Sequence, residues 1–99
     1  MGKSYSEVFD INERLTERYL LGKENKDRYV CSVGISLVRL NDPHADASVL
    51  EDYCISILVK GSIKSPFDIP LEEEGVRIYK REDGLLNALK KKDRSFSAP

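Results

Sequence analysis

The chain has 99 residues, of which 40% are hydrophobic and 33% are charged, and its formal net charge is −1. This length matches one domain, and this composition argues against intrinsic disorder and against a membrane protein. The balanced charge lacks the basic excess that is typical of nucleic-acid binders. The chain begins without an apolar run of the signal-peptide type. We therefore expect a cytoplasmic protein without nucleic-acid or membrane partners.

The first segment is predicted to be a helix. Ser4 and Glu7 have the spacing of a capping box, and Gly22 is typical of a helix end. The apolar residues between them recur at spacings of three and four, which places them on one stripe: Val8, Ile11, Leu15 and Tyr19.

Three strands are predicted to follow this helix. The first covers residues 29–38, with its larger side chains at odd positions, and Gly34 predicts either a bulge or close packing on the even face. The second covers residues 53–60 and is expected to pair antiparallel with the first. Residues 61–74 contain two prolines and are predicted to be a connection over the surface. The third strand is predicted over residues 76–81.

A short C-terminal helix is predicted after the third strand. Asp83 has the chemistry of its N-cap, and the apolar residues of the helix are Leu85, Leu86 and Leu89. The expected fold is therefore α+β in the order α-β-β-β-α, a three-stranded, mainly antiparallel sheet with both helices on its odd face. We expect one domain over residues 1–94 and a disordered tail over residues 95–99.

The two cysteines are predicted to be free thiols. Cys31 shares the odd face of its strand with apolar residues, whereas Cys54 lies on the opposite face of the sheet. A disulfide requires Cα atoms within about 7 Å and converging Cβ vectors, so this arrangement disfavours a bridge. We expect Cys31 to be a small core residue and Cys54 to be half exposed.

No pattern in the sequence predicts a catalytic, cofactor or metal site. The six glycines occur singly and make no phosphate-binding motif. The spacing of the densest group of candidate metal ligands fits no calcium-binding loop, and this group is interpreted as a polar connection: Asp42, His44, Asp46, Glu51 and Asp52.

The even face of the predicted sheet is more apolar than a solvated face should be, because it carries Val30, Val38, Leu40 and Leu58. A three-stranded sheet also has two edges, which proteins either guard or use for pairing. We therefore expect a non-enzymatic interaction or accessory domain that binds a protein partner, or a second copy, through a sheet edge or this face. The candidate surface comprises Val30, Val38, Leu40, Cys54, Leu58, Arg77 and Tyr79.

Two alternative functions stay open. One is a small thiol-dependent enzyme or regulator that uses Cys54 and His44. The other is an anionic-surface binder that uses the cluster Lys90-Lys91-Lys92 with Arg94. Cations of this kind are also expected at a helix C-terminus, where they interact favourably with the helix dipole.

Three segments together resemble a known family. They are Val33–Ser36 (VGIS), Cys54–Val59 (CISILV), and Ile69-Pro70 leading to Glu74–Ile78 (EGVRI) and Gly84. Their order is similar to the small α+β segment ahead of the peptidase domain in some bacterial trypsin-like proteins, where strands of the types VGIG, I-V-V-Y-V and IP…GVPV recur. The resemblance covers about half of the chain and includes no catalytic residue of that family. It implies a non-catalytic accessory domain that packs against a partner.

Overall fold

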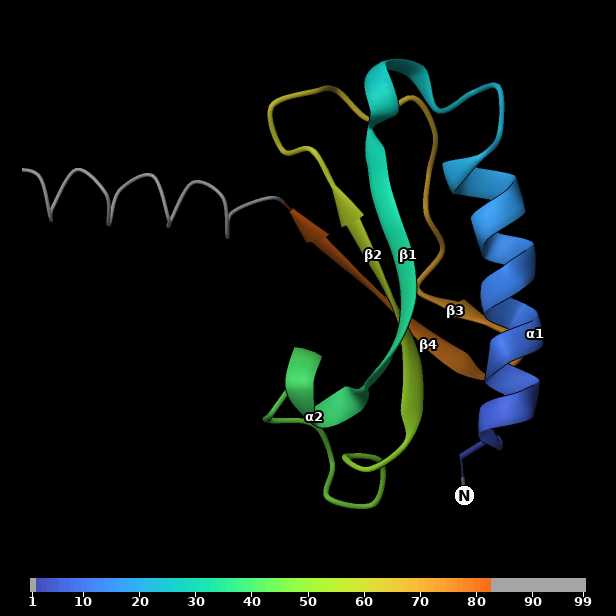
Figure 1. Ribbon diagram of the computed structural model, residues 1–99. Helices are drawn as coiled ribbons and strands as arrows, with labels where there is room; N and C mark the ends of the chain where they lie inside the picture. The colour runs from blue at the N-terminus through green and yellow to red at the C-terminus, as the bar shows by residue number, and fades with distance from the viewer. Residues whose placement is uncertain (1, 83–99) are drawn as a thin grey trace, which may run out of the picture.

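In the computed structural model, residues 2–82 form one long helix beside a four-stranded sheet (Figure 1). Helix α1, Tyr5–Leu15, continues as a π-helical turn over Thr16–Leu20. The capping box is confirmed: the Glu7 amide donates to Ser4 Oγ at 3.3 Å, and the Ser4 amide donates to Glu7 Oε1 at 3.2 Å. The backbone hydrogen bond from Ser4 is the main reason why the pKa of Glu7 lies below its usual value.

The sheet is mixed, and its strand order is β1-β2-β4-β3. Its strands are β1 (Val30–Leu37), β2 (Tyr53–Val59), β3 (Glu72–Glu73) and β4 (Val76–Glu82). β1 is antiparallel to β2 and β3 is antiparallel to β4, but β4 is parallel to β2. The predicted α+β class and N-terminal helix are confirmed. The prediction of three mainly antiparallel strands is wrong, because the chain crosses over between β2 and β4 and adds the short strand β3 on the way.

The crossover from β2 to β4 runs over the surface as predicted, since none of residues 61–74 is buried, and its apolar side chains also cover one side of the core. Parallel neighbours cannot be joined by a tight hairpin, so residues 60–75 must travel back along the sheet. On the way, Ile63, Phe67 and Ile69 pack against the buried cluster. The ring centroid of Phe67 lies 5.2 Å from that of Tyr19.

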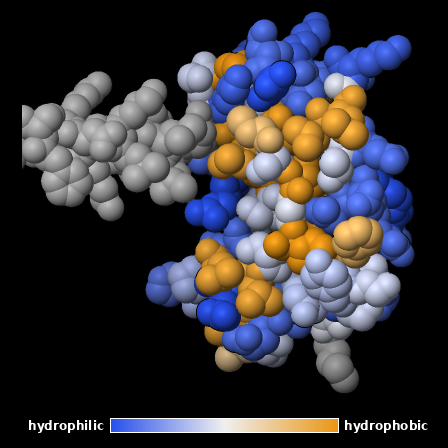
Figure 2. Space-filling view, in the orientation of Figure 1, coloured by the Kyte–Doolittle hydropathy of each residue, from blue (hydrophilic) through white to orange (hydrophobic). Residues whose placement is uncertain are grey.

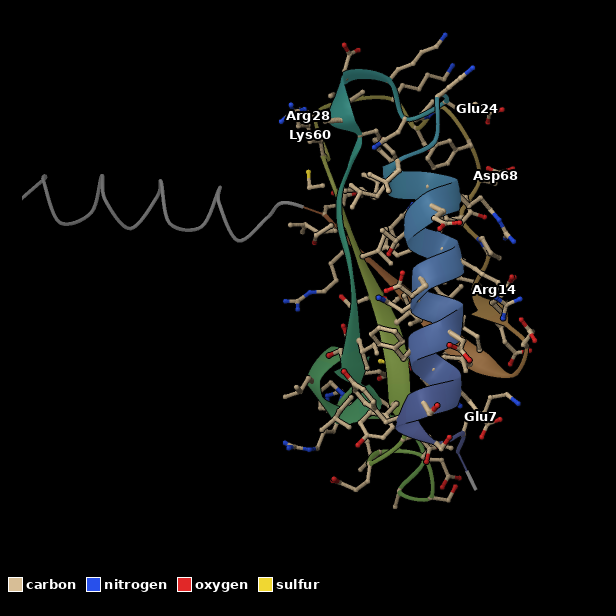
Figure 3. All side chains as sticks on the ribbon, turned by 45° about the vertical axis from the view of Figure 1, so that its right-hand side comes forward. Glu7, Arg14, Glu24, Arg28, Lys60 and Asp68 are labelled. Carbon is tan, nitrogen blue, oxygen red and sulfur yellow. The ribbon has the colours of Figure 1, made fainter. Side chains whose placement is uncertain are left out.

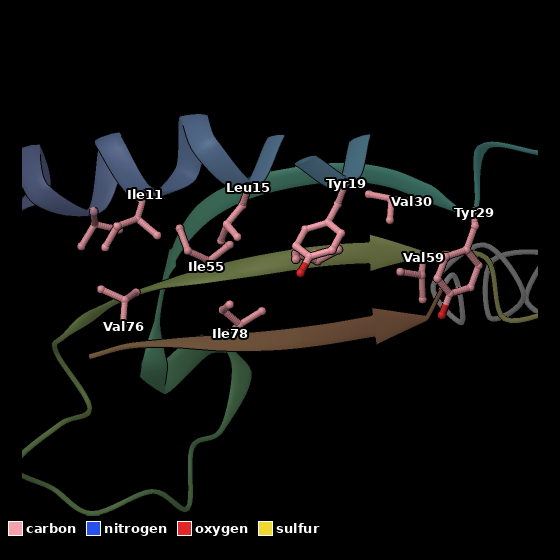
Figure 4. Packing of buried hydrophobic residues seen from close by; sticks show 11 residues of the cluster. Ile11, Leu15, Tyr19, Tyr29, Val30, Ile55, Val59, Val76 and Ile78 are labelled. Atoms are coloured by element: carbon pink, nitrogen blue, oxygen red, sulfur yellow. The ribbon is translucent and has the colours of Figure 1, made fainter. Parts of the chain in front are cut away.

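The core is one layer between α1, the crossover and one face of the sheet (Figure 4). Burial of one large aliphatic side chain stabilises the fold by roughly 1.5–3 kcal/mol, so this layer is the main source of stability. Its members are Val8, Ile11, Leu15, Tyr19, Tyr29, Val30, Ile55, Ile57, Val59, Val76 and Ile78.

A β-bulge at Cys31 changes which face each residue of β1 occupies. Val30 pairs with Val59, but Ser32 already pairs with Leu58, so Cys31 is the extra residue. Val30 therefore turns into the core, where it is 0% exposed, and Cys31 is exposed. The predictions of a core Cys31 and an even-face Val30 are wrong for this reason. Gly34 marks neither a bulge nor close packing, since a Cβ built there has no atom within 4 Å.

A short helix ends the predicted first strand early. This helix, α2 (Val38–Asn41), and the loop after it fold over one end of the even face. Val38 is 1% exposed and Cys54 is 0% exposed. The prediction of a half-exposed Cys54 is therefore wrong, although both cysteines are free thiols.

The predicted C-terminal helix, the Lys90–Arg94 cluster and the predicted tail over residues 95–99 lie outside the described range 2–82. Within that range, no helix has the length and apolar character that a membrane crossing requires.

Candidate protein-interaction surface

Among residues 2–82, no strand pairs with the outer side of β1, which is therefore an open edge of the sheet and contains no charged residue. The Val38 amide donates to the Asp52 carbonyl at 3.0 Å across the continuation of the β1–β2 ladder. Since alternate residues of an antiparallel strand share a direction, the N–H and C=O groups of Val33, Ile35 and Leu37 point away from β2. The Leu37 carbonyl accepts a hydrogen bond from Asn41 Nδ2 at 2.9 Å. The outward groups of Val33 and Ile35 remain as a template for another strand.

An apolar patch surrounds the C-terminal end of this edge. We call it the Tyr5 patch, and it consists of Tyr5, Phe9, Ile35, Leu37, Leu40 and Tyr53. The Tyr5 ring lies edge-on to Tyr53 at a centroid distance of 5.3 Å, and Phe9 lies 6.4 Å from Tyr5. Tyr5 is 53% exposed and Leu40 is 59% exposed, around a hollow of about 290 Å³. Large apolar side chains left in contact with water indicate an interaction site.

A second apolar patch lies at the other end of the same edge. We call it the Leu21 patch, and it consists of Leu20, Leu21 and Cys31, which line a hollow of about 600 Å³ together with the buried Val30 and with Arg28 and Lys60. Leu21 is 71% exposed. Arg28 and Lys60 lie together at the start of β1 (Figure 3). Figure 2 shows hydrophobic residues gathered on the side of the molecule that carries β1, with hydrophilic residues of α1 beside them.

The opposite edge of the sheet has the reverse character. β3 consists of two glutamates, and Glu74 and Gly75, with φ angles of 50° and 82°, turn the chain at once into β4. Arg18, from the π-helical turn after α1, approaches Glu73 at 3.4 Å, and Arg14 of α1 pairs with Glu74. A strand this short and this charged is a guarded edge.

Four of the seven residues in the predicted surface do not lie on an open even face. Val30 is in the core, and Val38 and Cys54 are sealed by α2 and its loop. Leu40 is exposed, but it belongs to the Tyr5 patch.

The other three predicted residues do share the even face, in the central and fourth strands. Leu58 is partly exposed and pairs with Arg81 of β4. Arg77 is exposed, and its Nη1 donates to the hydroxyl of the half-buried Tyr79 at 3.3 Å. With Val30 and Val38 removed, this face is less apolar than predicted, and the apolar surface lies along the β1 edge instead.

Cys54 is placed as a structural thiol. Asn41 Nδ2 lies 3.5 Å from its Sγ and 3.0 Å from Ser36 Oγ. Burial raises the pKa of Cys54 to about 11, which disfavours the thiolate that nucleophilic chemistry requires. His44 is an exposed loop residue, and the groups that interact with the Cys54 thiol are instead Asn41 and Arg77. Within residues 2–82, no three His, Cys, Asp or Glu residues come together as a metal site.

Sequence reasoning missed the aromatic half of the surface. Tyr5 and Phe9 are spaced by four residues, beside the core stripe of the same helix. This spacing places them on a second apolar stripe, a signal that was available in the sequence.

Comparisons of the chain with protein-family models, with curated proteins and with solved structures found no match. The likeness to the accessory segment of trypsin-like proteins stays a prediction.

Proposed function

We propose that this chain is a non-enzymatic protein-interaction domain that binds an extended segment of a protein chain along β1. The observation that carries the proposal is the open, uncharged β1 edge with an exposed apolar patch at each end. Strand addition to such an edge supplies backbone hydrogen bonds, while neighbouring pockets select side chains. The accessory role implied by the family resemblance agrees with this function, and cytoplasmic location remains a prediction.

The contacts of β1 give the proposal its chemistry. The outward N–H and C=O groups of Val33 and Ile35 would pair with the backbone of the bound segment, and the two hollows would receive apolar side chains near its ends. A bound segment with charged residues between its two apolar ends would be disfavoured, because these charges would lie beside β1, which carries no charge to pair with them.

The proposal is tested by selecting random displayed peptides on the immobilised domain at low density, where copies do not meet. Gly34→Lys places a cation on the β1 edge without a clash, since the site has open space for a Cβ. Glu72→Lys places a cation on the β3 edge and is the matched control. Peptides selected on the wild type should bind Gly34→Lys at least roughly ten-fold more weakly and Glu72→Lys equally well. Peptides that bind all three proteins alike would contradict the proposal.

A further inference from the structure

We propose that the occupant of the β1 edge is a second copy of this chain, paired antiparallel about a two-fold axis at Gly34. This inference rests on the proposed function, because it uses the same edge. It assigns the domain a homodimeric state with one continuous sheet of eight strands across the two copies.

The position of the remaining outward groups places the axis. Between the bulge at Cys31 and Leu37, whose carbonyl already accepts from Asn41, these groups belong to Val33 and Ile35, and Gly34 lies midway between the two residues. Pairing about Gly34 uses the groups of both residues, since Val33 of one copy then exchanges backbone hydrogen bonds with Ile35 of the other. Gly34 would face Gly34 of the second copy in a non-hydrogen-bonded pair, where strands approach most closely.

The apolar patches match under this symmetry. A two-fold axis perpendicular to the sheet keeps both α1 helices on the same face and reverses the direction of β1. The Tyr5 patch of one copy then lies beside the Leu21 patch of the other, twice in the dimer. Each exposed apolar group thus gains an apolar neighbour, as expected at a self-complementary interface.

The charges at the two ends of β1 favour the same arrangement. At its start, residues 23–28 and Lys60 have a net charge of +2, from four cations and two carboxylates. At its end, residues 38–52 have a net charge of −3, from one arginine and four carboxylates, with His44 neutral. Antiparallel pairing brings the basic end of one copy to the acidic end of the other. Parallel pairing would instead place the two basic ends side by side and the two acidic ends side by side, so it is disfavoured.

Cysteine cross-linking tests the register directly, in a Cys31→Ser, Cys54→Ala background that removes both native thiols, because Cys54 pairs with Ser36 across the strands and would otherwise bridge to a cysteine introduced there. Non-hydrogen-bonded pairs have Cα atoms about 4.5 Å apart, within the range that a disulfide spans. Gly34→Cys should therefore cross-link to a dimer under mild oxidation. Ser36→Cys, on the same face, should stay monomeric on a non-reducing gel, because its partner position is Ser32 of the second copy. Mixing Ser32→Cys with Ser36→Cys should restore the cross-link.

Light scattering on the unmodified chain accompanies this experiment. The wild type should be dimeric, and Gly34→Lys should dissociate on the order of a hundred-fold more readily, since it places like charges directly opposite each other. Gly34→Thr is the matched control and should stay dimeric, because it adds an uncharged strand-forming residue in open space. A wild type that stays monomeric at high concentration would overturn the inference, and so would equal cross-linking of Gly34→Cys and Ser36→Cys.

The two proposals fail in different ways. If the wild type is monomeric but the peptide selection still depends on Gly34, the second copy is the wrong occupant and the β1 binding function stands. If neither dimerisation nor peptide binding responds to Gly34→Lys, both proposals are wrong.

Discussion

The two edges of the sheet differ in length, in charge and in what covers them. β1 has eight residues without a charge, and apolar side chains stand exposed at both of its ends. β3 has two residues, both glutamates, and α1 with its π-helical continuation extends two arginines towards it and the turn after it. The same helix therefore guards one edge with ion pairs and lines the other with Tyr5 and Phe9. Within the described residues, the fold therefore closes one edge of the sheet with charge and leaves the other, β1, without a neighbouring strand.

The largest expected effect is a loss of stability from a substitution in the hydrophobic core, which packs against the whole sheet including both edges. Leu15 is 0% exposed, so Leu15→Ala should lower the free energy of unfolding by about 2–5 kcal/mol, through lost burial and the cavity that remains. Denaturant unfolding measures this loss. Leu71→Ala is the matched control next to the β3 edge, where Leu71 is 82% exposed, and its effect should stay within about 0.5 kcal/mol. Similar losses for the two variants would show that the core is placed wrongly.

The next effect concerns Cys54, which lies under α2 at the end of β1 that carries the Tyr5 patch. Its pKa is raised by burial from 9.0 to about 11, so the folded state holds the proton more tightly than the unfolded state. This contribution to the free energy of unfolding is complete below about pH 9 and is lost as the pH rises towards 11. The loss amounts to about 3 kcal/mol. Unfolding free energies measured across this range should show the decline in wild type and in Cys31→Ala. Cys54→Ala should lack this component, and an unchanged decline would mean that α2 does not seal this end.

The smallest expected effect concerns the guarded edge. Arg18 and Glu73 are 3.4 Å apart, but the Arg18 side chain is 49% exposed, so solvent screens the pair. A double-mutant cycle with Arg18→Ala and Glu73→Ala should give a coupling energy of about 0.2–1 kcal/mol that falls with added salt. A coupling several times larger would mean that the β3 edge is held by more than a surface ion pair.

Much of the fold was predictable because local patterns determine it. The capping box of Ser4 and Glu7 marks the start of α1, and the apolar stripe that follows is buried as its spacing predicts. The alternation in β2 likewise places Ile55 and Ile57 on the core face. These features depend on residues close together in the chain.

The remaining features depend on contacts between distant segments. Nothing near Cys31 marks the bulge that turns Val30 into the core, and the glycine expected to mark one lies in open space. The parallel pairing of β4 depends on the path of residues 60–75 back along the sheet, and no local pattern in that segment marks this path. For the interaction surface, the sequence predicted the use of a sheet edge. Strict alternation along the strands, however, assigned the additional apolar residues to the even face. The bulge and α2 remove that excess, because they bury Val30 and Val38.

Amide hydrogen exchange at Val33 and Ile35, followed residue by residue as the protein concentration increases, tests the central claim most directly. Pairing along β1 predicts that exchange at these two outward amides slows with concentration and that Gly34→Lys abolishes the slowing. The amides of Glu72 and Glu73 on the guarded edge should not respond. Exchange at Val33 and Ile35 that is independent of concentration, in wild type and variant alike, would contradict pairing of a second copy with β1.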